Sequence, residues 1–96
     1  MSELEKIRSK KKTIQKIANK YGITKILIFG SVARGDDRSD SDIDLLVTLE
    51  KNKTLFDLGG FYMDLSKLLD KEISLVTTES INGYFKENIL RDSVPL

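Results

Sequence analysis

Two short motifs, separated by a polar stretch, limit what this chain can fold into. In residues 26–35, an apolar run ends at Gly30 and a second glycine follows at position 35. Residues 41–47 lead through Asp42 and Asp44 into another apolar run. This order predicts a strand, a glycine turn opening a short helix, an acidic loop and a second strand. Because strand side chains alternate between faces, the two aspartates should point the same way, with Cα atoms about 6.6 Å apart.

Paired aspartates at the start of an apolar strand have two interpretations. Taken alone, Asp42 and Asp44 are more often a solvated strand end than a binding site. Like charges on one face repel, however, and a bound divalent cation would remove that repulsion. Together with the glycine turn, the motif therefore predicts a site for a metal ion and a phosphorylated ligand.

Two familiar loop motifs do not fit this region. Gly30 and Gly35 have the spacing of a P-loop, but two aspartates follow where that loop needs Lys and Ser or Thr, and they would repel a phosphate. Three alternating aspartates match the start of an EF-hand, yet Leu45 stands where glycine is needed and Lys51 where a bidentate Glu is needed. Both loop types are excluded on chemistry.

The pattern that remains resembles the DNA polymerase beta-like nucleotidyltransferase superfamily, in particular its minimal single-domain members that serve as antitoxins of HEPN toxins. The resemblance is carried by Gly30-Ser31, by residues 33–35 and 41–47, and it extends through residues 75–77 and the C-terminal helix. It implies Mg²⁺-dependent transfer of AMP from ATP to a hydroxyl, with tyrosine as the expected acceptor, on a cognate HEPN toxin. It also implies a hetero-oligomer with that toxin.

The resemblance assigns roles to five residues. Gly30 lets a triphosphate approach the backbone, and Ser31 offers a hydroxyl and an N–H at the start of a short helix. Arg34 would add positive charge to the bound phosphates, although a solvated arginine is an equal alternative. Asp42 and Asp44 would hold Mg²⁺, which prefers oxygen ligands.

One departure from the family pattern puts catalysis in doubt. Members usually carry a third carboxylate on a later strand, and here Ser74 stands at that position. A serine hydroxyl carries no negative charge for a metal and is a poor base at neutral pH. Glu72 lies two residues earlier on the same strand face and is a candidate metal ligand. A weak or inactive antitoxin that binds nucleotide and occludes its partner is therefore the main alternative, and a small-molecule nucleotidyltransferase is a distant third.

Composition excludes several other kinds of site. The 96 residues predict one domain, 1–96, and the chain contains neither cysteine nor histidine. Disulfides, thiolate or imidazole metal sites and Ser-His-Asp triads therefore cannot form. No apolar run approaches about 20 residues, so we expect no membrane span and a cytoplasmic location.

The net charge of +1 hides a strong polarity along the chain. Residues 1–35 hold nine Lys or Arg and two acidic residues, whereas residues 36–96 hold seven and thirteen. Much of the positive charge lies on one predicted helix, 3–21, with Ser2 and Glu5 spaced as a capping box and Gly22 as its stop. No aromatic residue interleaves with these lysines, so nucleic-acid binding is not assigned.

The remaining elements follow from periodicity and capping. Thr54 and Asp57 predict the start of a helix that runs to Leu69, with a looser first turn because Gly59-Gly60 disfavours helix. A strand at 75–77 and a last helix with Ile81, Tyr84, Phe85 and Ile89 follow, and residues 94–96 are a further candidate for sheet contact. The order predicts an α/β (α+β) domain, and the resemblance implies a small mixed sheet with helices packed on it and the metal site on its open face.

Overall fold

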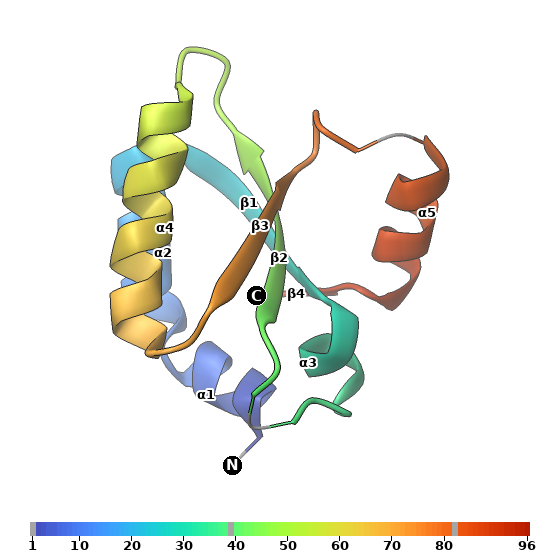
Figure 1. Cartoon of the computed structure of the whole chain (residues 1–96). Coiled ribbons are helices and arrows are strands. Elements are labelled where there is room, and N and C mark those ends of the chain that lie inside the picture. Colours follow the sequence, from blue (N-terminus) through green and yellow to red (C-terminus); the bar gives the residue numbers. More distant parts are fainter. Residues whose placement is uncertain (1, 39, 82) are drawn as a thin grey trace.

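The computed structural model describes residues 2–38, 40–81 and 83–96. Five helices and four strands alternate along this part of the chain (Figure 1). Their order is α1 (Glu3–Ser9), α2 (Lys11–Tyr21), β1 (Ile23–Phe29), α3 (Gly30–Arg34), β2 (Ile43–Leu49), α4 (Leu55–Leu69), β3 (Ile73–Thr77), α5 (Gly83–Asp92) and β4 (Val94–Pro95). No helix among the described residues is long and apolar enough to cross a lipid bilayer.

The strands form one mixed sheet in the order β3-β2-β1-β4. Strands β1 and β2 are antiparallel, and Phe29 pairs with Asp44; β2 and β3 are parallel, and Asp44 pairs with Ser74. The short β4 pairs antiparallel with Leu27 and Ile28 of β1. The α+β class and the mixed sheet are confirmed, and the expected contact of residues 94–96 adds the fourth strand.

Helices cover both faces of the sheet unequally. Helices α1, α2 and α4 lie on one face and α5 on the other, while α3 lies at the end of the sheet and adds the buried Val32 to the main core (Figure 1). The main core fills the first interface, and its fully buried members include Ile7, Ile14, Ile28, Phe61 and Leu65. On the second face, Leu27 and Leu46 meet Leu90 of α5 around a small hollow. The face opposite the main core is therefore only partly covered.

The single helix predicted over residues 3–21 is wrong, because α1 and α2 are separate. The break falls at Lys10, whose φ of −104° and ψ of 15° are not helical. The Ser9 hydroxyl donates to the Lys6 carbonyl at 2.6 Å, an alternative to continued helix that serine commonly offers. The predicted ends are confirmed: the Ser2 hydroxyl accepts from the Glu5 N–H, and Gly22 ends α2 with φ of 75°.

Helix α4 has the predicted start and no looser first turn. Thr54 and Asp57 form a reciprocal capping box, and the helix is regular from Leu55 through the glycine pair. Gly60 lies against the Tyr21 ring, which a Cβ at that position would strike. At Gly60 the absence of a side chain therefore lets α2 pack closely on α4. This tertiary contact offsets the poor helix propensity of glycine.

Candidate functional site

Asp44 lies on the sheet face opposite the main core. Its neighbours Ile43 and Leu45 are buried in that core, so alternation along β2 directs Asp44 to the other face. Phe29 of β1 and Ser74 of β3 flank it in register. The sheet thus presents one half-buried carboxylate between the end of β1 and the start of β3.

The glycine turn meets this carboxylate directly. Gly30 follows β1 and has a φ of 74°, a left-handed conformation that glycine adopts most easily. A Cβ on Gly30 would collide with Oδ2 of Asp44. The turn therefore needs glycine twice, for its backbone angle and for the close approach of Asp44.

Ser31 and Gly35 shape the segment after the turn. The Ser31 carbonyl accepts the N–H of Asp36 at 3.0 Å, and Gly35 ends α3 with a φ of 79°. Among the described residues, the Ser31 hydroxyl has no hydrogen-bond partner. Ser31 therefore sits one residue from the Gly30–Asp44 contact with its hydroxyl available to a ligand.

Electrostatics link Asp42 and Arg34 to Asp44. Asp42 is exposed and lies one residue before β2, at the end of the acidic loop. Burial raises the pKa of the Asp44 carboxyl, the negative charge of Asp42 raises it further, and the positive charge of Arg34 opposes both effects. Asp42 and Arg34 thus both act on the Asp44 carboxyl, at the same end of the sheet.

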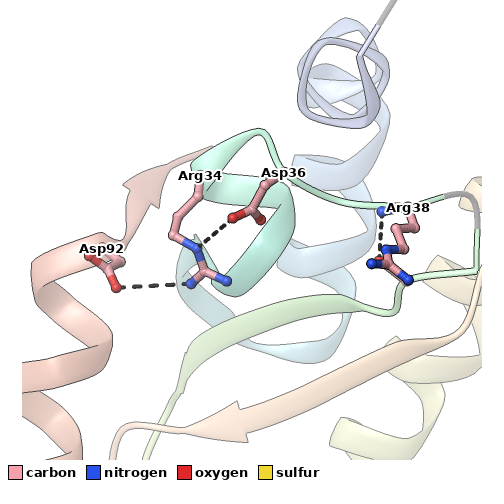
Figure 2. A network of polar contacts seen from close by, with 5 residues as sticks. Arg34, Asp36, Arg38 and Asp92 are labelled. Atoms are coloured by element: carbon pink, nitrogen blue, oxygen red, sulfur yellow. Dashed lines mark hydrogen bonds and ion pairs between the residues drawn. The ribbon is translucent and has the colours of Figure 1, made fainter.

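Arg34 also connects α3 to α5. Its Nε lies 3.3 Å from Oδ2 of Asp36, and its Nη1 lies 4.0 Å from Oδ2 of Asp92, the last residue of α5 (Figure 2). Nearby, the Arg38 N–H donates to the Ser41 hydroxyl at 2.8 Å. Nothing in the sequence signals the Arg34–Asp92 contact, since the two residues lie 58 positions apart.

Ser74, which the family resemblance places at the third-carboxylate position, pairs in register with Asp44. The Glu72 carboxylate accepts the Tyr62 hydroxyl at 2.5 Å, and this bond raises the pKa of Tyr62. Helical spacing gives no signal for this hydrogen bond between α4 and the start of β3. Among the described residues, no three His, Cys, Asp or Glu side chains are arranged to hold a metal ion together.

Comparison with known proteins gives a family match over most of the chain. Residues 12–96 match the model of the polymerase beta nucleotidyltransferase domain. A Methanocaldococcus jannaschii protein, provisionally named a protein adenylyltransferase, is 38% identical over 84 residues, which are 88% of this chain and 90% of that protein. Protein adenylyltransferase MntA of Thermococcus cleftensis is 30% identical, with 98% of this chain and 93% of the relative covered.

Solved structures show the same architecture. A structure described provisionally as a minimal nucleotidyltransferase superposes with a TM-score of 0.88 at 34% identity, covering 100% of this chain and 97% of that one. A complex of a tri-AMPylated Shewanella oneidensis HEPN toxin with an MNT antitoxin gives a TM-score of 0.66 at 18% identity, covering 92% and 69%. The second likeness is one of fold.

Proposed function

This chain belongs to the polymerase beta nucleotidyltransferase family, and from that premise we propose that it transfers AMP from ATP to a tyrosine hydroxyl of a HEPN toxin. In this reaction the hydroxyl oxygen loses its proton and bonds to the α-phosphorus, the bond from that phosphorus to the bridging oxygen breaks, and pyrophosphate leaves. The observation that carries the proposal is the contact between the Gly30 turn and the Asp44 carboxylate. It brings the predicted phosphate-binding and metal-binding halves of the motif together.

The donor set suits Mg²⁺. Asp42 and Asp44 offer carboxylate oxygens, which hard cations prefer, and the chain has no histidine or cysteine to favour a softer metal. The raised pKa of Asp44 reflects burial and repulsion by Asp42, both of which a bound cation would relieve. When bound, Mg²⁺ would neutralise charge on the reacting phosphate groups. Asp42 and Asp44 would hold it, with Glu72 as a further candidate ligand.

The triphosphate would lie along the glycine turn. Gly30 puts no side chain of its own between the backbone and a phosphate, and Ser31 supplies a hydroxyl without a partner among the described residues. Arg34 faces Asp36 and Asp92 and lies close enough to lower the pKa of Asp44. A bound phosphate would offer this guanidinium a further anionic partner.

Ser74 supports a second candidate function. Its hydroxyl stands beside Asp44, where the family usually has a carboxylate, and it cannot supply that negative charge. In this alternative the chain binds nucleotide weakly or without turnover and neutralises the toxin by covering it. Both candidates require a hetero-oligomer with the toxin and a cytoplasmic location, since the toxin would act there.

The double variant Asp42→Asn with Asp44→Asn separates the two candidates. We expect it to fold, to bind a cognate HEPN toxin and to transfer no label from α-³²P-ATP in the presence of Mg²⁺. A cell-protection assay with the same variant gives the second readout. Protection equal to that of the wild type would overturn the catalytic proposal and support occlusion.

The variant Ser74→Asp tests the missing carboxylate. If chemistry is limited by its absence, restoring it should raise the rate of AMP transfer about 100-fold or more, the contribution typical of one positioned acid–base group. Ser74→Asn is the matched control, because it has a similar size and no charge. Equal rates for the two variants would show that the third carboxylate is not what limits this protein.

A further inference from the structure

A hollow on the described surface lies far from Asp44. It has a volume of about 490 Å³ and lies between α2 and the outer edge of β1, beside the end of β4. We call it the edge hollow. Its polar lining is Lys11, Gln15, Asn19 and Lys25, and its apolar floor includes Ala18 and Ile26.

The charged side chains that line the edge hollow are both lysines, Lys11 and Lys25. Residues 6–35 contain nine Lys or Arg and no acidic residue. Some of these cations are engaged within the molecule: Lys20 approaches Asp64 at 3.7 Å, and Lys10 donates to the Leu68 carbonyl at 3.1 Å. Among the described residues, neither Lys11 nor Lys25 has a side-chain partner. The hollow is therefore bordered by two cations without a side-chain partner: Lys11 of α2, and Lys25, which also borders the small hollow beside Leu27 on the other sheet face.

The same hollow borders an open strand edge. Strand β4 pairs only with Leu27 and Ile28, and the Leu96 N–H then reaches the Ile26 carbonyl at 3.4 Å. The register between β1 and β2 is interrupted between Ile23 and Lys25. No strand in the described part of the chain pairs with residues 23–25 along this outer edge, and an exposed edge can pair with an added strand.

We propose that the edge hollow binds an acidic polypeptide segment in extended conformation, which continues the line of β4 along β1. The positive charge of Lys11 and Lys25 would attract its carboxylates, the edge of β1 would bond its backbone, and the apolar floor would take the side chains that face α2. A nucleic acid fits less well, because no aromatic side chain lines the hollow to stack on bases.

This site is independent of the proposed AMP transfer. Residues 23–25 begin β1, whereas Phe29 at its other end pairs with Asp44. At 3.3–3.4 Å per residue, the two ends of the strand are about 20 Å apart. The segment would therefore anchor a partner without entering the Asp44 site.

The test uses the full chain and a fluorescent eight-residue peptide of alternating valine and glutamate, titrated by fluorescence anisotropy. The double variant Lys11→Glu with Lys25→Glu should weaken binding at least about tenfold. The matched control, Lys12→Glu with Lys16→Glu, has the same net charge but alters exposed α2 residues outside the hollow. It should weaken binding by less than about threefold. Circular dichroism checks that both variants fold.

Three results would overturn the proposal. Equal weakening by both double variants would show a general charge effect, and tighter binding of an oligouridine probe than of the peptide would identify a nucleic-acid surface. A peptide of the same charge with prolines in place of the valines has no backbone N–H to donate at those positions and should bind about fivefold more weakly. Unchanged binding of this peptide would exclude strand pairing.

Discussion

The turn after β1 and the middle of α4 each contain a glycine that admits a side chain from a neighbouring element. At Gly30 the admitted group is the Asp44 carboxylate, and at Gly60 it is the Tyr21 ring. A second glycine lies close by in each region: Gly35 ends α3, and Gly59 precedes Gly60 in α4. A Cβ on either would meet nothing within 4 Å. The chain therefore supplies its own matched controls for two close approaches.

The difference between the two approaches lies in what the admitted group does. Tyr21 packs against α4 and donates its hydroxyl to Asp64 at 2.8 Å, so the Gly60 contact holds two helices together. Asp44 gains no such partner at the turn, and its environment disfavours its charge. One approach stabilises the fold, whereas the other holds a carboxylate in an unfavourable place that only a ligand would relieve.

Gly30→Ala should have the largest effect. The new Cβ would displace the Asp44 carboxylate, and a displacement of about 1 Å in a catalytic site can reduce the rate about 100-fold. Gly35→Ala has a similar backbone cost, about 1–2 kcal/mol for a left-handed residue, without the collision. AMP transfer and chemical unfolding measured on both variants separate the two costs. Similar activities would contradict the proposed importance of the Gly30–Asp44 contact.

Gly60→Ala should reduce stability and leave AMP transfer nearly unchanged. Its Cβ would strike the Tyr21 ring, and overpacking of this kind costs about 1–3 kcal/mol. Gly59→Ala should instead raise the free energy of unfolding by up to about 1 kcal/mol through helix propensity. Urea denaturation measures both values. Equal changes in the free energy of unfolding for the two alanine variants would contradict the close contact between Gly60 and Tyr21.

Asp44→Asn should change the pH dependence of stability. Because the folded state raises the pKa of Asp44, it binds the proton more tightly than the unfolded chain, and wild-type stability should rise as the pH falls from neutral through that pKa. Without Mg²⁺, the variant should melt a few °C above the wild type at neutral pH, and the gap should close in acid. Mg²⁺ with ATP should stabilise the wild type and not the variant. Thermal scans at several pH values, with and without Mg²⁺, measure both effects.

Glu72→Gln should have the smallest effect. The Tyr62 hydroxyl already donates to one oxygen of the Glu72 carboxylate. Loss of this carboxylate should therefore weaken apparent Mg²⁺ binding by about tenfold or less, the effect typical of residues that support the direct ligands of a metal. Titration calorimetry with Mg²⁺ and a non-hydrolysable ATP analogue gives the affinities. A loss as large as that of Asp44→Asn would make Glu72 a principal ligand.

Local patterns predicted the parts of the fold that depend on neighbouring residues. The caps at Ser2 and Thr54, the stop at Gly22 and the position of Ser74 beside Asp44 follow from spacing or from the family resemblance, and the structure has them. The break at Lys10 was missed because helix periodicity continues across it. The hydrogen bond from the Ser9 hydroxyl to the Lys6 carbonyl does not alter the spacing of the apolar residues, so that spacing cannot reveal it.

The sequence by itself determined the family, the glycine and aspartate motif, and the charge asymmetry, because these depend only on residue types and their spacing. Only the tertiary structure decided that Gly60 admits Tyr21, that Tyr62 binds Glu72, that Arg34 reaches Asp92, and that two lysines border an open strand edge. Each of these contacts joins residues that are distant along the chain or on separate elements. Their distances depend on how the helices and the sheet pack, which no local pattern encodes.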